Sequence, residues 1–234
     1  MDRRTFLSAG GALALSACAM PRRGEFEATS VPAPQWRVGD RWTFRRTDGY
    51  NGLPRGVLTR RVESIDASGI RFITTDENGK VHDNALFESP GIEVSGTLSE
   101  DTPRIGTFTP ALRMYDFPLV SGKEWRQAVH RTDSNGYRIY MTASIGVEGW
   151  EEVRAGGKAY RALVIRRAFM LGPGSFYPNS YDRNLNREEI EWYVPELRGP
   201  ARVRIQEWYP PHAGGVGIEP GDFFHQALES FQLA

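Results

Sequence analysis

Short runs of alternating apolar and polar residues, each ending at turn-forming residues, constrain the fold of this chain more than any other feature. The run Ile70–Thr74 shows the pattern, since it alternates and is followed by the Asn78-Gly79 turn. Alternation with a period of two is typical of a strand with one buried face, and an Asn-Gly turn is a strong hairpin signal. Similar runs cover residues 41–45, 57–65, 125–131, 137–142, 160–166, 189–194, 201–207 and 224–233.

These runs predict a mainly β fold of roughly a dozen strands joined mostly by short turns. We expect an antiparallel, strongly curved sheet, either a half-open or a closed barrel, with at most one or two short helices. Within 99–118, Pro110 in a first turn indicates one such helix, whereas 224–233 is interpreted as a last strand. No amphipathic helical stretch separates the strands, which argues against a doubly wound parallel sheet.

The charge balance and the cysteine content exclude several classes of protein. The 234-residue chain carries 29 Lys and Arg and 29 Asp and Glu, so its formal net charge is zero. A protein that coats nucleic acid shows a basic excess, so we expect no nucleic-acid partner. Cys18 is the single cysteine, which excludes an intrachain disulfide and a cysteine-based zinc site.

The N-terminus has the pattern of an export signal, with a charged start, an apolar run over 6–17 and small residues near its end. The run has about a dozen residues, and a membrane-spanning helix needs about 20. The start resembles the twin-arginine export motif, which Arg3, Arg4, Phe6 and Leu7 carry. We therefore predict that 1–17 is a signal peptide.

Cys18 ends this apolar run directly after Leu15, Ser16 and Ala17, a sequence that resembles the lipobox of bacterial lipoproteins. The resemblance implies cleavage before Cys18 and attachment of acyl chains such as palmitate to that residue. Several acyl chains together anchor a protein firmly. The resemblance further implies a location at the periplasmic face of a membrane, and Ala19 favours the outer membrane.

The rest of the chain divides into a tether and a domain. Residues 18–35 combine proline and glycine with few large apolar groups, which predicts a flexible tether after the lipid. Residues 36–234 predict a single β-rich domain. Gly39–Trp42 and Gly122–Trp125 share a Gly-x-x-Trp phrase before a strand. Two related halves, about 36–98 and 119–234, are one interpretation of this echo, and chance similarity between two hairpins is the other.

Three phrases occur together along the domain: Trp36–Phe44 at its start, Phe117–Trp125 in mid-chain and Trp192–Pro195 near its end. Together they resemble a group of uncharacterised bacterial envelope proteins with β-rich domains, over most of 36–207. The resemblance implies a β fold and an envelope location and brings no catalytic residue. By fold-level analogy, a related architecture is the half-barrel of lipoprotein carriers, which holds acyl chains in an apolar concavity.

Motifs for catalysis or metal binding are missing from the sequence. There is no Gly-x-Ser-x-Gly and no P-loop, and the four histidines lack metal-ligand spacing, so we assign no catalytic residue, metal or cofactor. Glu189 and Glu191 share one face of a strand, as a sugar-cleaving pair would, but we expect a solvated strand face. The arginine pairs at 45–46, 60–61 and 166–167 should each split between opposite faces.

Aromatic residues are the remaining candidates for binding. Phe176, Tyr177 and Tyr181 lie in a loop rich in turn formers, and long aromatic loops often line binding sites. With Trp192 and Tyr193, they form our candidate surface for a ligand or partner. The alternative for all five, and the favoured one, is a purely structural packing role.

The leading functional hypothesis is a lipid-anchored periplasmic protein without catalytic activity that holds an apolar ligand or a partner protein in the cell envelope. The alternative is an envelope hydrolase, acting on a polysaccharide or lipid, whose carboxylates come from separate strands. A third hypothesis is a purely structural assembly factor. A deep apolar cavity would favour the first, convergent acids with shifted pKa values the second, and a flat exposed aromatic patch the third.

Overall fold

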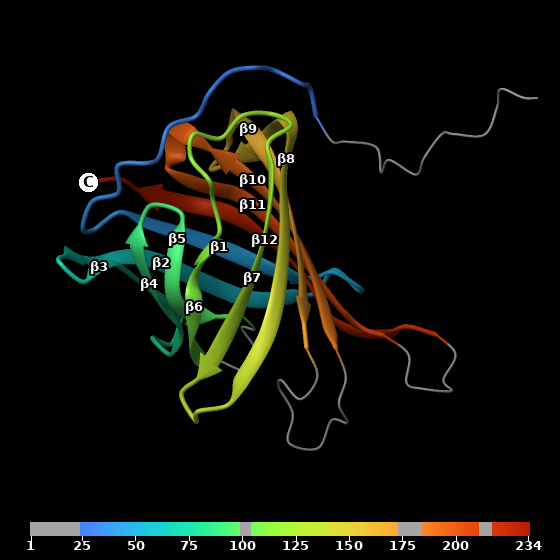
Figure 1. Ribbon diagram of the computed structural model, residues 1–234. Coiled ribbons are helices and arrows are strands. Elements are labelled where there is room, and N and C mark those ends of the chain that lie inside the picture. The colour runs from blue at the N-terminus through green and yellow to red at the C-terminus, as the bar shows by residue number, and fades with distance from the viewer. Residues whose placement is uncertain (1–23, 99–103, 173–183, 211–216) are drawn as a thin grey trace, which may run out of the picture.

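The computed structural model describes residues 24–98, 104–172, 184–210 and 217–234. Within these ranges, the regular structure consists of twelve strands and one short 3-10 helix (Figure 1). In chain order these are β1 (Arg41–Asp48), β2 (Pro54–Asp66), β3 (Gly69–Asp76), β4 (Val81–Ser89), β5 (Ile92–Thr97), β6 (Ile105–Arg113), β7 (Glu124–Asp133), β8 (Arg138–Ala155), β9 (Lys158–Leu171), β10 (Leu185–Val194), η1 (Pro195–Leu197), β11 (Gly199–Tyr209) and β12 (Glu219–Gln232).

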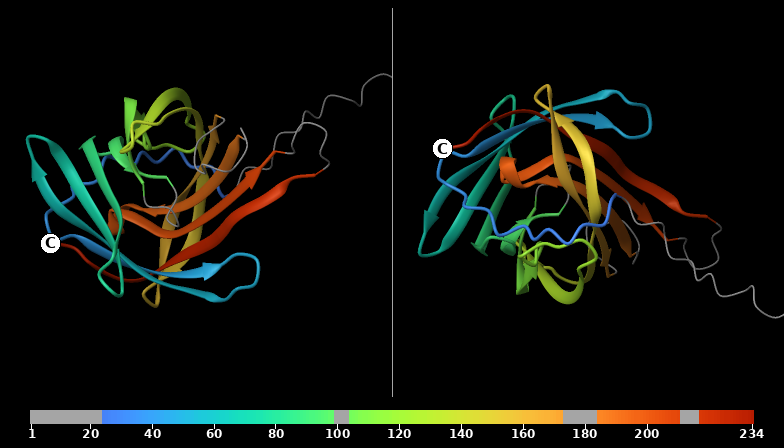
Figure 2. Two further views of the ribbon diagram at one scale, coloured as in Figure 1. Left: turned by 90° about the horizontal axis from the view of Figure 1, so that it is seen from below. Right: turned by 90° about the horizontal axis from the view of Figure 1, so that it is seen from above.

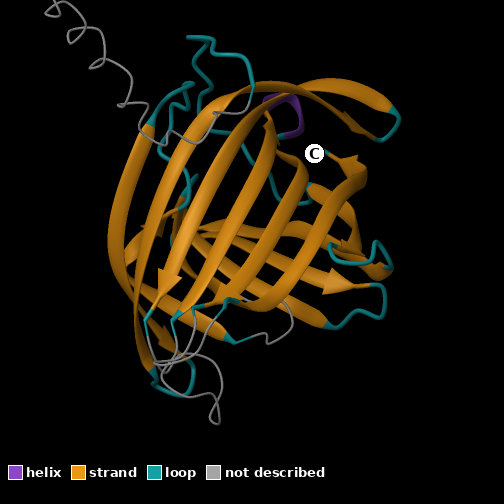
Figure 3. Cartoon of the chain, turned by 90° about the vertical axis from the view of Figure 1, so that its right-hand side faces the viewer, coloured by secondary structure: helices purple, strands orange, loops and turns teal. Residues whose placement is uncertain are grey.

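The strands form one closed antiparallel barrel in which each strand pairs with its neighbours in sequence, and β12 returns to pair with β1. Figure 3 shows the strands wrapping round the interior. The expected mainly β, curved and antiparallel fold is thereby confirmed in its closed-barrel form.

The alternation seen in the sequence decides which side chains enter the barrel. In β8, Ile139, Met141 and Ala143 are buried, while Arg138 and Tyr140 are exposed. Among the described residues, buried side chains of β6–β10, together with Val31 and Leu119, form one large apolar cluster. A second large cluster joins residues of β1–β4 to residues of β8–β12 and includes Trp42, Phe72 and Trp192. Because successive side chains on a strand point to opposite faces, this one pattern supplies both the core and the outer surface.

The prediction of a helix at Pro110 is wrong, because Pro110 lies in the strand β6. Phe108 and Leu112 point into the barrel and are 4% and 0% exposed. Burial of these two side chains within the sheet outweighs a weak local helix signal. The expected last strand over 224–233 is confirmed, since it lies almost wholly within β12.

Residues 24–40, here called the N-terminal strap, cross one end of the barrel (Figure 2). Glu25 forms a β-bridge with Trp150, and Val31 forms another with Leu119. Val31 is only 3% exposed and belongs to the core. The described part of the expected tether therefore packs on the domain, because Val31 gains a buried apolar position there.

The two Gly-x-x-Trp phrases have similar local structures. Gly39 and Gly122 both have a positive φ, of 94° and 85°. Trp42 donates its indole N–H to the Leu197 carbonyl (2.7 Å) and Trp125 donates to the Arg113 carbonyl (3.0 Å). Two related halves remain a prediction.

Candidate functional site

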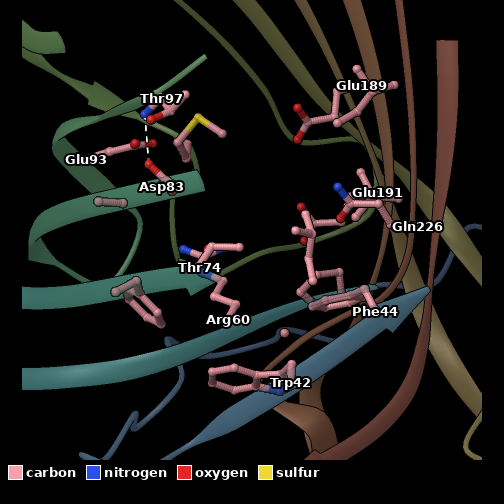
Figure 4. A pocket seen from close by; sticks show the side chains of 18 of the residues that line it. Trp42, Phe44, Arg60, Thr74, Asp83, Glu93, Thr97, Glu189, Glu191 and Gln226 are labelled. Atoms are coloured by element: carbon pink, nitrogen blue, oxygen red, sulfur yellow. Dashed lines mark hydrogen bonds between the residues drawn. The ribbon is translucent and has the colours of Figure 1, made fainter. Parts of the chain in front are cut away.

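A cavity of about 180 Å³ lies within the barrel (Figure 4). An engineered cavity of about 150 Å³ binds a benzene molecule, so this space suits a small ligand or one segment of a larger one. Most of its lining comes from β1–β5 and from β10–β12. One side is aromatic and the other is charged.

The aromatic wall consists of Trp36, Trp42, Phe72 and Phe87. Trp36 meets Phe72 edge to face with ring centroids 4.8 Å apart, and Phe72 meets Phe87 in the same way at 5.5 Å. The indole N–H of Trp36 donates to the Arg198 carbonyl (2.8 Å), which leaves its ring free to pack. Because Trp36 lies on the N-terminal strap, the strap supplies part of the wall.

Glu189 and Glu191, which we expected on a solvated face, point into the barrel and are 8% and 4% exposed. That expectation is wrong because Arg167 on the neighbouring strand β9 pairs with both carboxylates inside the barrel. Arg167 Nη1 donates to Glu191 Oε2 (2.6 Å) and to Glu189 Oε1 (2.9 Å). A buried carboxylate is tolerated when it is paired and hydrogen-bonded in this way.

Tyr115 and Arg187 extend this arrangement into a buried ionic network. The Tyr115 hydroxyl donates to the Glu191 carboxylate (2.7 Å to Oε1), and Arg187 donates to Glu207 (2.8 Å) and to Glu189 (3.3 Å). Burial, followed by the charge of Glu191, raises the pKa of Tyr115 well above its usual range. Burial alone would lower the pKa of Arg167, but Glu191 and then Glu189 outweigh it and hold that pKa above its ordinary value. Arg167 therefore stays positively charged, and the Tyr115 hydroxyl stays protonated.

The three arginine pairs split between faces as predicted. Arg166 points outward and donates to Glu148 and to Glu188 (2.6 Å each), while Arg167 is fully buried. In the second pair, Arg45 reaches Glu229 outside and Arg46 is 8% exposed.

In the third pair, Arg61 meets Glu63 and Arg60 lines the cavity. The Arg60 guanidinium lies 4.3 Å from the centroid of Phe72, against the aromatic wall.

Asp83 on β4 and Glu93 on β5 form an acid corner beside the aromatic wall, opposite Glu189 and Glu191 in Figure 4. The backbone N–H of Thr97 donates to Asp83 Oδ1 (2.9 Å). Burial, followed by the nearby charge of Asp83, raises the pKa of Glu93 to about 8. Burial also raises the pKa of Asp83, and the positive charge of Arg60 opposes that rise. At neutral pH, Glu93 is therefore mainly protonated.

Sequence reasoning missed Arg60, Asp83, Glu93 and Tyr115. One signal was present for Asp83, since it is in phase with the buried Ala85 and Phe87 on the same strand. Glu93 gave no such signal, because β5 is a short strand without clear alternation.

Trp192 and Tyr193 project from opposite faces of β10, and neither lines the cavity. The indole N–H of Trp192 donates to Glu151 on β8 (2.7 Å), the strand that also contacts β11 and β12. Tyr193 packs inside against Tyr115 and Phe117. The remaining candidates lie outside the described residues: Arg3, Arg4, Phe6, Leu7, Leu15, Ser16, Ala17, Cys18, Phe176, Tyr177 and Tyr181.

Within the described ranges, no group of three His, Cys, Asp or Glu side chains is arranged to hold a metal ion. His82, which lines the cavity, contacts Asp76 instead (Nε2 to Oδ2, 3.0 Å). The same part of the chain contains no helix long and apolar enough to cross a bilayer.

No protein-family model and no curated protein matches this chain. Among solved structures, it is similar to a candidate lipoprotein from Parabacteroides distasonis (16% identity, TM-score 0.48, covering 88% of this chain and 100% of that one). It is also similar to a candidate exported protein with a YmcC-like fold from Bacteroides fragilis (14%, 0.48, 87% and 100%). A third similar structure is the hypothetical lipoprotein YmcC from Escherichia coli (9%, 0.43, 85% and 90%).

Proposed function

We propose that this chain is a lipid-anchored, periplasmic binding protein of the bacterial cell envelope that holds a small amphipathic ligand inside its barrel and catalyses no reaction. The observation that carries the proposal is the cavity of about 180 Å³ with its aromatic wall. Ligand sites are typically concave and mostly apolar, with a few polar groups that fix orientation.

The two walls would have different roles. Trp36, Trp42 and Phe72 would cover the apolar part of the ligand, because burying apolar area is favourable at about 25 cal/mol per Å². In the ionic network around Arg167, the carboxylates of Glu189 and Glu191 are already hydrogen-bonded within the protein, so they need no cationic ligand. The acid corner is then the part of the cavity free to meet the polar end of the ligand.

The membrane-anchoring part of the proposal rests on the sequence. Arg3 and Arg4 would direct export, and Cys18 would carry the acyl chains, including palmitate, that hold the chain at the membrane. Ala19 favours the outer membrane over the inner one.

Ligand content is the direct test. The chain should be exported without Cys18, purified gently, extracted with organic solvent and analysed by mass spectrometry. We expect a stoichiometric small amphipathic molecule in the extract, absent from an empty-vector preparation. An empty protein would oppose a bound ligand and favour a protein partner, to be sought by crosslinking in the periplasm.

The acid corner also gives a reason to test the alternative hypothesis that the protein is an envelope hydrolase. A carboxyl group that is protonated at neutral pH can act as a general acid, and Glu93 with its raised pKa meets that requirement beside Asp83. Incubation with envelope polysaccharides and lipids would test it. Turnover by the wild type that Glu93→Gln abolishes would establish the enzyme, and absence of turnover would favour binding alone.

A further inference from the structure

We propose that the polar end of the ligand is a protonated amine, bound by the carboxyl groups of Glu93 and Asp83 at the edge of the aromatic wall. This inference rests on the proposed function, because it assigns chemistry to the same cavity. Three observations carry it: an unpartnered buried carboxyl group, an imbalance of buried charge, and a wall that already holds one cation.

The unpartnered group is Glu93. Its side chain lines the cavity and the residue is 9% exposed. No described residue hydrogen-bonds its carboxyl group or forms an ion pair with it within 4.0 Å. Oε1 occupies the space beside Gly96, where an added Cβ would come within 1.9 Å of it, so the glycine makes room for the carboxyl group. A buried polar group without a partner is costly, which indicates that something else meets it.

The other carboxylates of the interior already have cationic partners. Arg131 bonds to Asp133, Arg167 holds Glu189 and Glu191, and Arg187 holds Glu207. In the acid corner, Arg60 attracts both carboxyl groups, and Asp83 accepts the additional hydrogen bond from Thr97. Glu93 is the acid left over, and only a proton or a further cation can balance its charge.

The aromatic wall accommodates a cation. The guanidinium of Arg60 lies 4.3 Å from the Phe72 centroid and 5.8 Å from that of Phe87. A positive charge over a ring face is attracted by the ring quadrupole, and proteins use aromatic rings in this way to recognise ammonium groups. A ligand ammonium beside Phe87 would meet one of these two rings.

Several charged groups set the protonation of Glu93. Asp83 on β4 and Glu189 on β10 repel its negative form, whereas Arg60 on β2, Arg167 on β9 and Arg131 on β7 favour it. The free carboxyl group holds a proton at neutral pH. Binding of an ammonium would ionise Glu93 and release that proton to solvent, so amine affinity should fall as the pH decreases below about 8.

The test compares three probes with one alkyl chain and different heads: hexylamine, 1-hexanol and hexanoate. Their binding to the full lipidated chain in nanodiscs is measured by calorimetry, with empty nanodiscs as the blank. At a pH of about 8 we expect hexylamine to bind at least about tenfold more tightly than 1-hexanol, as a charge-assisted hydrogen bond provides. Toward a pH of about 6, its affinity should fall roughly tenfold per pH unit, with proton release visible in buffers of different ionisation enthalpy.

Glu93→Gln should remove the hexylamine preference and its pH dependence, whereas the matched control Glu88→Gln, at an exposed residue outside the cavity lining, should leave both unchanged. Equal binding of amine and alcohol by the wild type, or preference for hexanoate, would overturn the amine assignment and leave the binding function intact. Absence of binding by all three probes would overturn both. The wild-type comparison needs no variant, so it holds even if Glu93→Gln impairs folding.

Discussion

Arg167 Nη1 lies 2.6 Å from Glu191 Oε2, and the two side chains are 0% and 5% exposed. The residue before it, Arg166, forms ion pairs of the same length on the outer face of the barrel. Two consecutive arginines therefore make similar contacts in very different surroundings. The comparison separates the effect of burial from the effect of pairing.

Replacing Arg167 by methionine should destabilise the barrel by about 3–5 kcal/mol, because Glu191 would remain buried without its cation and Glu189 would keep only the longer contact with Arg187. Replacing Arg166 in the same way should cost about 1 kcal/mol or less, since its partners stay close to water. Urea unfolding followed by circular dichroism measures both. Equal losses for the two variants would contradict the buried network.

Stability should fall as the pH rises from about 4 to about 8. The pKa of Glu93 is about 8 in the folded chain, whereas a free glutamate has a pKa of about 4.3. Between these values the folded state binds a proton that the unfolded state has lost, so stability is highest below the range and levels off above it.

Glu93→Gln should abolish this contribution, which approaches about 1.4 kcal/mol per pH unit. Urea midpoints at pH values of about 5, 7 and 9 provide the measurement, with Glu88→Gln as the control. A wild type and a Glu93→Gln variant with the same pH dependence would speak against the raised pKa.

Val31→Ala should destabilise the domain by about 1–3 kcal/mol, because Val31 is 3% exposed and belongs to the core. Val38→Ala, in the same strap but 55% exposed, should change the free energy of unfolding little. Chemical denaturation of both variants tests whether the strap is part of the folded unit. A neutral effect at Val31 would place the domain start nearer to Trp36.

Cys18→Ala should prevent lipid attachment, because this residue is the chain's only cysteine. We expect loss of labelling by an alkyne analogue of palmitate and a shift of the protein out of the membrane fraction. Labelled, membrane-bound protein in the variant would refute the lipoprotein assignment.

Replacing Arg3 and Arg4 together by lysine should block export if the twin-arginine route is used, because that route recognises the arginine pair itself. Fractionation of cells into periplasm and cytoplasm measures the result. Export at the wild-type level would instead indicate the general secretory route.

The sequence predicted those features that depend on alternation along a single strand. The mainly β fold, the last strand and the division of each arginine pair follow from the period of two. The burial of Glu191 was not predictable in this way, because alternation says which residues share a face and not whether that face is wet. Glu191 can be buried because Arg167 on the neighbouring strand β9 pairs with it, and alternation along β10 does not reveal that partner.

The packing of Val31 and the acid corner depend on contacts between distant parts of the chain. Val31 forms its β-bridge with Leu119, which is distant in the sequence. Asp83 comes close to Glu93 only when β4 and β5 pair. A proline-rich segment has the composition of a tether whether or not one of its valines finds a site on the barrel. Such long-range pairings leave no local pattern in the sequence.

The ring of β-ladders is uneven. β8 pairs with β9 from Met141 to Ala155, whereas β6 pairs with β7 only over Gly106–Thr109. Farther along, the Gln127 side chain bonds to the backbone of Arg113 instead (3.2 and 3.3 Å). Local opening costs least where the fewest backbone hydrogen bonds break, so thermal breathing of the barrel should concentrate on this side. Since β5 lies next to this seam, such breathing would admit water and solutes to Glu93 while the long β8–β9 hairpin stays intact.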